Sequence, residues 1–81
     1  MFNCVLHVAE ADATGNVIAR AANLSGIVGR GRTQREAIAS SVAAFKAAVA
    51  EHHARGEAIP FLSAPAMPGP GETQLLIAVH L

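Results

Sequence analysis

Four histidines are the residues of this sequence best suited to metal binding or acid–base catalysis. His52 and His53 are neighbours near the end of a predicted helix, so they project about 100° apart and cannot easily share one metal ion. We expect them to interact with the helix C-terminus, where positive charge is favoured. His7 and His80 lie on predicted strands, without Asp, Glu or Cys at ligand spacing. We therefore expect no metal and no histidine-based catalysis.

The acidic, hydroxyl and thiol side chains show no catalytic pattern either. The carboxylates have no D-x-D or E-x-x-H spacing, and the serines lack the strand–turn–helix context of a hydrolase nucleophile. Cys4 stands in an alternating apolar run, which indicates a buried hydrophobic role. The sequence predicts no catalytic residue and no cofactor, so we expect a protein that is not an enzyme.

A small basic cluster precedes the predicted helix and is the best candidate for binding. It consists of Arg30, Arg32 and Arg35 beside two glycines. The free amides of a helix N-terminus can bind phosphate or carboxylate groups. The phosphate-binding pattern G-x-x-x-x-G-K-[ST] is absent, however. Exposed polar surface at a strand end is the alternative interpretation of these arginines.

Composition indicates one small globular domain over residues 1–81. The chain is 52% hydrophobic and 15% charged, with a formal net charge of zero. Zero net charge does not favour direct DNA binding, and it removes one barrier to association between copies. Small domains often need oligomerisation for stability, so we expect a homo-oligomer. No basic leader and no apolar run of about 20 residues is present, so we expect a cytoplasmic protein that does not enter a membrane.

The element that must position the basic cluster is one long helix. Thr33 and Glu36 have the spacing of a capping box, in which each side chain accepts a hydrogen bond from a free first-turn amide. The helix is predicted from Gln34 to about Ala54, and Gly56 and Pro60 mark its end. These signals predict where the helix begins and ends.

The two faces of this helix differ in residue size. The stripe expected to face the core consists of Ile38, Val42, Phe45 and Val49. The face expected to lie opposite is small and nearly uncharged: Ser40, Ala43, Ala44, Ala47, Ala50 and Ala54. Alanine tolerates solvent in a helix, but such a surface also lets a partner approach closely. Ala43 and Ala47 therefore join the three arginines as candidate partner-binding residues.

Four alternating segments are predicted to form strands. Their ranges are Phe2–Ala9, Val17–Ala22, Ile27–Arg30 and Thr73–Leu81. Glycines 29 and 31 suggest a bulge, an edge or a close backbone approach in the third strand. The last strand is apolar on both faces, which indicates that it is well buried or covered by another molecule. Residues 61–72 are rich in Pro and Gly and are predicted to form a loop.

The stretch from Leu24 to Ile38 resembles the signature of HicB-like proteins. That family shows L-P-G, four residues, and then G-D-T-x-x-E-A-L. The matching residues here are Gly26, Gly31, Thr33, Glu36, Ala37 and Ile38. Residues 56–60 are similar to the family's G-E-x-I-P, and Glu10, Asp12 and Gly15 resemble its acidic turn. Ser25 replaces the usual proline and Arg32 the usual aspartate, which changes the local charge beside the helix cap.

The resemblance implies a partial ribonuclease H-like fold without nuclease residues. The expected architecture is α+β, in two layers ordered β-β-β-α-β. One helix packs on a mostly antiparallel four-stranded sheet of order 3-2-1-4, with the first and last strands parallel. The family implies an antitoxin that binds and inhibits a small ribonuclease toxin. Many members carry a C-terminal DNA-binding domain, which we do not expect here because the chain ends at its last predicted strand.

Two other functions are compatible with the sequence. The chain could be an orphan oligomeric domain of this fold that acts as a scaffold or binds a small ligand. A nuclease with metal chemistry of the ribonuclease H type would need carboxylates clustered on strands. Glu10 and Asp12 alone do not form such a cluster.

Overall fold

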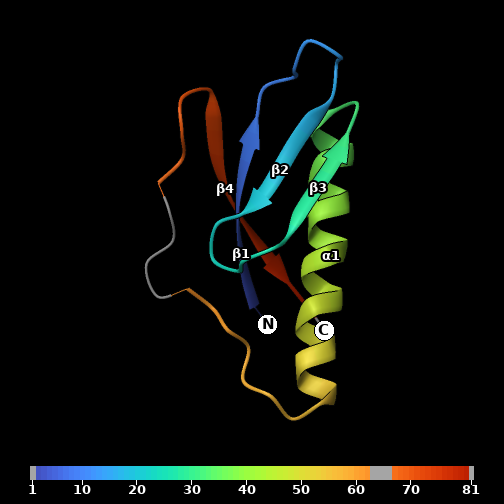
Figure 1. Cartoon of the computed structure of the whole chain (residues 1–81), viewed down its shortest axis with the longest axis vertical. Helices are drawn as coiled ribbons and strands as arrows, with labels where there is room; N and C mark the ends of the chain where they lie inside the picture. Colours follow the sequence, from blue (N-terminus) through green and yellow to red (C-terminus); the bar gives the residue numbers. More distant parts are fainter. Residues whose placement is uncertain (1, 63–66, 81) are drawn as a thin grey trace.

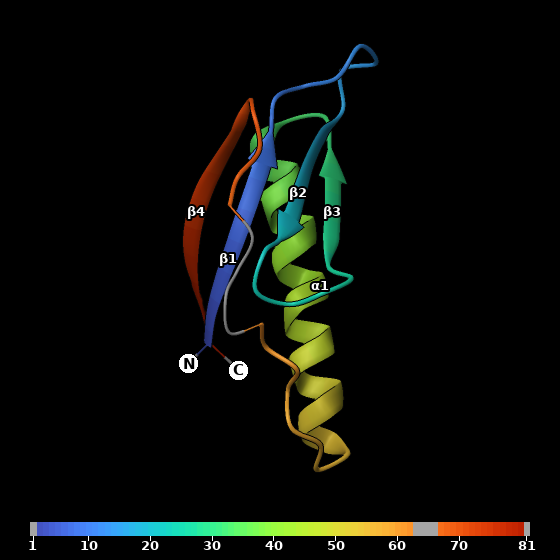
Figure 2. The ribbon, with the colours of Figure 1, turned by 60° about the vertical axis from the view of Figure 1, so that its left-hand side comes forward.

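The computed structural model describes residues 2–62 and 67–80, and it shows the predicted α+β architecture. The elements are β1 (Phe2–Ala9), β2 (Val17–Ala21), β3 (Val28–Gly31), α1 (Gln34–Ala54) and β4 (Glu72–Val79). The four strands form one sheet of order β3-β2-β1-β4, as expected, and α1 covers one face of it (Figures 1 and 2). Leu81 and part of the predicted 61–72 loop, residues 63–66, lie outside the described residues.

The expected parallel pairing of the first and last strands is wrong. β4 pairs with β1 antiparallel, with Phe2 opposite Val79 and Ala9 opposite Glu72. The physical reason is the long connection between α1 and β4. β4 starts next to the end of β1, where Glu72 lies opposite Ala9, and runs in the opposite direction (Figure 1). β4 is therefore an antiparallel partner of β1, and all three strand pairs of the sheet are antiparallel.

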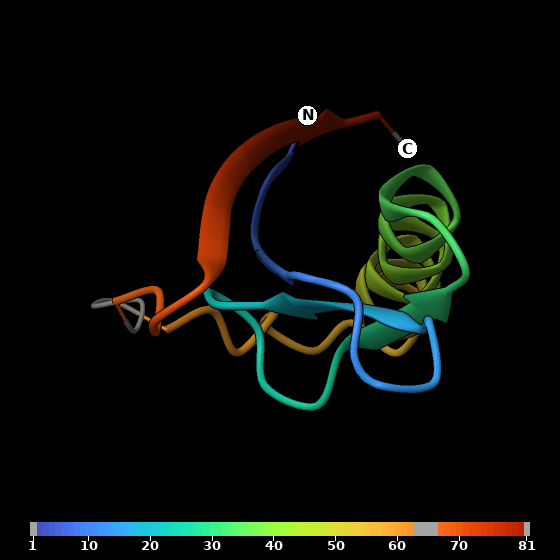
Figure 3. The ribbon, with the colours of Figure 1, turned by 90° about the horizontal axis from the view of Figure 1, so that it is seen from above.

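The sheet is strongly curved, and α1 lies on its concave side (Figure 3). The helix packs mainly against β3 and β2, less against β1 and hardly at all against β4. The strand faces follow the predicted alternation. Cys4, Leu6 and Val8 of β1 are buried on the face of the sheet that α1 covers. Burial raises the pKa of the Cys4 thiol to about 11, which fits its predicted role as a hydrophobic core residue.

Two glycines allow the helix to lie directly on β3. A Cβ at Gly29 would lie 2.3 Å from the backbone nitrogen of Ser41 and 2.5 Å from the carbonyl oxygen of Ala37. A Cβ at Gly31 would lie 2.4 Å from the Cβ of Glu36. Of the three explanations that the sequence left open for these glycines, close backbone approach and an edge position are therefore both correct.

This close approach rotates the helix from its predicted orientation. Ala37 and Ser41 are fully buried, because only small side chains fit against the β3 glycines. Ile38 and Val42, which were expected in the core, are only partly buried. Ala44, predicted to lie on the outer face, packs against the core instead. Phe45 and Val49 are buried as expected.

Three phenylalanines form an aromatic cluster at one end of the core. The ring of Phe61 lies 6.0 Å, between centroids, from the rings of both Phe2 and Phe45. Phe2 belongs to β1 and Phe45 to α1, whereas Phe61 comes from the segment that leads to β4. Tilted aromatic pairs at this separation are favourable. The cluster thus connects the helix to the β1–β4 half of the sheet.

Asn23 extends the sheet beyond the end of β2. Its side-chain amide donates to the carbonyl oxygen of Asn3 at 2.7 Å, and its side-chain oxygen accepts from the backbone N–H of Val5 at 3.1 Å. The side chain therefore substitutes for a strand where the chain turns away toward β3. No local sequence signal marks this role of Asn23, because its partners are 18 and 20 positions away.

Both ends of α1 follow the sequence signals. The Thr33 hydroxyl accepts from the backbone N–H of Glu36 at 3.1 Å, which confirms the N-cap. The Glu36 carboxylate accepts from the backbone N–H of Arg32 at 2.9 Å, one residue before the position expected in a capping box. At the other end, Gly56 has φ +69°, and the backbone N–H of Glu57 donates to the carbonyl of His52. This is a Schellman motif.

Candidate partner-binding surface

A shallow apolar groove lies along the exposed flank of α1. It has a volume of about 700 Å³ and its lining residues all come from the helix: Gln34, Arg35, Ile38, Ala39, Val42, Ala43 and Lys46. The opposite flank, with Ala37 and Ser41, is pressed against β3. The groove therefore lies on the side of the helix away from β3.

The chemistry of this groove suits a partner with an apolar segment and acidic groups. Ile38 and Val42 form an apolar floor that the core only partly covers. Arg35 and Lys46 are exposed at its rim and make no ion pair in the described part of the chain. A hydrophobic centre with a polar rim is typical of protein interfaces. No acidic residue lines the groove.

The structure brings together two of the five predicted partner-binding residues. Arg35 and Ala43 both line the groove. Ala47 is exposed on α1 but does not line it. Arg32 is exposed at the start of the helix, beside the cap. Arg30 is on the far face of the sheet, because its neighbours on β3 are the glycines that face the helix.

Sequence reasoning missed Ile38, Val42 and Lys46 as surface residues. The first two have the spacing of a core stripe, so hydrophobicity alone placed them inside. The signal that could have corrected this was the pair of glycines in β3, which predicts that the smallest helix residues face that strand. Strand alternation also separates Arg30 from Gly29 and Gly31, and so from the helix side.

A second hollow, of about 420 Å³, lies on the face of the sheet opposite the helix. It is lined in part by His7, Arg20 and Glu72. The His7 ring is buried, and its Nε2 is 3.1 Å from the side-chain oxygen of Gln74. Arg20 donates to the Glu72 carboxylate and lowers its pKa, with further help from the Gly69 backbone N–H at 2.7 Å. Arg20 and Glu72 thus pair with each other, so the described residues give this hollow no unpaired acidic group for a ligand.

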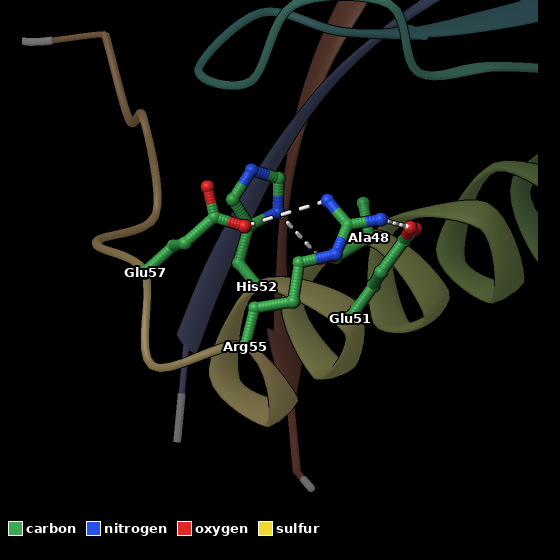
Figure 4. A network of polar contacts seen from close by, with 5 residues as sticks. All are labelled: Ala48, Glu51, His52, Arg55 and Glu57. Atoms are coloured by element: carbon green, nitrogen blue, oxygen red, sulfur yellow. Dashed lines mark hydrogen bonds and ion pairs between the residues drawn. The ribbon is translucent and has the colours of Figure 1, made fainter.

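Asp12 and His52 have structural roles. Asp12 accepts hydrogen bonds from the hydroxyl and backbone N–H of Thr14 and the backbone N–H of Asn16, and these bonds lower its pKa. At the helix end, the His52 Nδ1 is 2.8 Å from the carbonyl oxygen of Ala48 (Figure 4). Among residues 2–62 and 67–80, no three His, Cys, Asp or Glu side chains are grouped to hold a metal ion.

Arg55 makes two further polar contacts at the same helix end. It contacts the Glu51 carboxylate one turn earlier and lies 3.4 Å from the Glu57 carboxylate beyond the glycine (Figure 4). All three side chains are more than half exposed, so these pairs contribute little to stability.

Within the described ranges, α1 is not long and apolar enough to span a bilayer.

Comparison with solved structures identifies this arrangement. The chain has the fold of a HicB antitoxin domain. It superposes on the N-terminal domain of the Burkholderia pseudomallei antitoxin HicB with a TM-score of 0.74, covering 99% of this chain and 100% of that one. Sequence identity is 20%, so the similarity shows the fold. No protein-family model and no curated protein matches the sequence. The predicted resemblance to HicB-like proteins is thus confirmed by the structure.

Proposed function

We propose that this protein is a non-catalytic binding domain that acts as an antitoxin and inhibits a small ribonuclease toxin. The observation that supports this most directly is the similarity over the full domain to the N-terminal domain of a HicB antitoxin. The signature between Gly26 and Ile38 agrees with this proposal, and several of its residues, Gly31, Thr33 and Glu36, also have roles in the fold.

The groove on α1 is the surface that we propose for the toxin. Its apolar floor is partly exposed, and the two basic residues of its rim, Arg35 in the first turn of the helix and Lys46 near its middle, are exposed. The partner would then present an apolar segment flanked by carboxylates. Two of the residues that the sequence proposed for partner binding, Arg35 and Ala43, contribute to this one surface.

Co-expression with the small protein encoded beside this gene tests the proposal. We expect that protein to stop growth when expressed alone, and the present chain to restore growth and to co-purify with it. The absence of both a complex and a rescue would disprove the antitoxin function. It would favour the alternative of an orphan oligomeric domain.

A matched pair of variants tests the groove itself. Ala39→Glu places a carboxylate in the groove, whereas Ser40→Glu places the same group on the neighbouring exposed position outside it. We expect Ala39→Glu to abolish rescue and co-purification, and Ser40→Glu to retain both. Circular dichroism of both variants checks that the helix is intact. Equal behaviour of the two variants would move the toxin-binding surface elsewhere on the domain.

A further inference from the structure

The edge strand β4 exposes apolar side chains on both of its faces. Leu76 is 72% exposed on the face opposite the helix, and Leu75 and Ile77 are only partly buried on the concave face. The interpretation of β4 as a well-buried strand is therefore wrong for Leu76. From Thr73 to Val79 the strand has no charged residue and no proline. Isolated domains normally protect their edges with such residues, and this edge has none.

Along this edge, the backbone of β4 also has hydrogen-bonding groups for which residues 2–62 and 67–80 supply no partner. Asn3 and Val5 direct their backbone groups toward the β2 side, where Asn23 and Ala22 bond them. The backbone N–H and C=O groups of successive residues point to opposite sides of a strand. Those of the even-numbered residues of β1 therefore point toward β4. Their partners in β4 are the odd-numbered residues 73, 75, 77 and 79. Gln74, Leu76 and Ala78 consequently direct their N–H and C=O groups away from the sheet.

We propose that a second copy of this chain pairs with this edge, β4 against β4 and antiparallel, about a two-fold axis at Leu76. The two four-stranded sheets then form one continuous eight-stranded sheet. Leu76 lies opposite Leu76 of the second copy, and Gln74 lies opposite Ala78. This proposal does not depend on the antitoxin function.

The edge is complementary to itself in this register, which is why we propose a second copy as its partner. On the concave face, Leu75 lies opposite Ile77 of the second copy, so apolar side chains meet at both symmetric positions. At each end of the pairing, Glu72 lies opposite His80, the residue after β4. No like charges meet in this arrangement. The net charge of zero adds no long-range repulsion between copies.

The mass in solution tests the dimer. Sedimentation velocity of the full chain should give twice the chain mass of 8.3 kDa. Leu76→Lys places two like charges opposite each other at the axis, so we expect the mass to fall to that of one chain while the circular dichroism spectrum is retained. The control is Val28→Lys on the other edge strand, which changes a residue 47% exposed on the same face of the sheet. This variant should remain dimeric.

Cysteine cross-linking tests the register independently. In the proposed dimer the two Cα atoms at position 76 are about 5.5 Å apart, within the range for a disulfide. Leu76→Cys should therefore oxidise to a covalent dimer. The control Gln74→Cys should not, because its two copies lie about 13 Å apart along the strands. The native Cys4 is fully buried and does not compete.

Three outcomes would overturn the proposal. They are a monomeric wild-type chain, a dimer that survives Leu76→Lys but not Val28→Lys, and a Gln74→Cys cross-link without one at position 76. A wild-type monomer whose β4 amides become protected from hydrogen exchange only with the toxin would assign this edge to the toxin instead. Failure of the toxin experiments, by contrast, leaves the dimer measurements unaffected.

Discussion

The two edge strands of the sheet, β3 and β4, differ in length, charge and cover. β3 has four residues, carries Arg30, and lies in direct backbone contact with α1 through its glycines. β4 has eight residues, is apolar through its middle, and has almost no contact with the helix. Short length and charge are established ways of preventing strand addition. The comparison indicates that one edge of this domain is closed and that the other is available for pairing.

The difference also shows how the small helix residues are used. On the β3 side, Ala37 and Ser41 are buried against the β3 glycines inside the domain. On the other flank, the larger Ile38 and Val42 are left partly exposed and form the groove. Tight packing of α1 on β3 therefore leaves apolar side chains partly exposed on the opposite flank of the helix. The following predictions test this asymmetry, beginning with the largest effect.

Phe45→Ala should have the largest effect, because Phe45 is fully buried and contacts the Phe61 ring that joins the helix to the β4 half. We expect a loss of about 3–5 kcal/mol in the free energy of unfolding, measured by urea denaturation. Phe61→Ala is the control, because that ring is already 39% exposed and should cost less. Equal losses of unfolding free energy in the two variants would show that Phe45 of the helix stabilises the core no more than Phe61 does.

Gly29→Ala should disrupt the closed edge. The added Cβ overlaps backbone atoms of Ser41 and Ala37, which cannot move without shifting the helix. We expect a loss of about 3 kcal/mol in unfolding free energy. On the open edge, Ala78→Val also adds methyl groups but to an exposed position, so the melting temperature should hardly change. If Gly29→Ala were as stable as wild type, α1 could not lie so close to β3.

Thr33→Ala removes the N-cap of the helix at the β3 side. We expect a loss of about 1 kcal/mol, because the Glu36 backbone N–H loses its partner. Thermal denaturation monitored at the helix band measures it. Thr73→Ala makes the same change on exposed β4 and should cost less. An unchanged melting temperature in Thr33→Ala would mean that the helix begins at another residue.

Acid should weaken the contact between Arg20 and the start of β4. The pKa of Glu72 in the folded protein is lowered from its ordinary value of 4.5, first by the Arg20 hydrogen bond and then by the Gly69 backbone N–H. Its contribution to stability is therefore fully present above about pH 4.5 and is lost as the pH falls through the lower folded pKa. Asp12 changes stability in the same direction, because its folded pKa is also lowered.

Melting temperatures between pH 7 and pH 3 measure this contribution, which should be the smallest of the four. Glu72→Gln and Arg20→Met should each lose fewer degrees on acidification than wild type, because neither retains the charged contact. Identical pH profiles for the variants and wild type would show that this contact does not stabilise the folded state.

Local sequence signals predicted most of the fold. The boundaries of α1, its Thr33 cap and its Gly56 end agree with the structure, because each depends on residues within one helical turn. The alternation in β1 also placed Cys4, Leu6 and Val8 on one face, since period-two patterns are local, but it did not predict that His7 on the other face is buried as well. Arg35 and Ala43, which charge and size marked as candidate partner-binding residues, both line the groove on α1, and their role in binding stays a prediction.

The sequence by itself thus determined the elements, their caps and the faces of the central strands. Only the tertiary structure decided the direction of β4, the rotation of α1 and the position of the groove. The direction of β4 depends on the path of the long segment after the helix, which contains no local signal for its end point. The rotation of α1 depends on contacts between the β3 glycines and residues 36–41. Those contacts leave Ile38 and Val42 partly exposed, and α1 makes hardly any contact with β4.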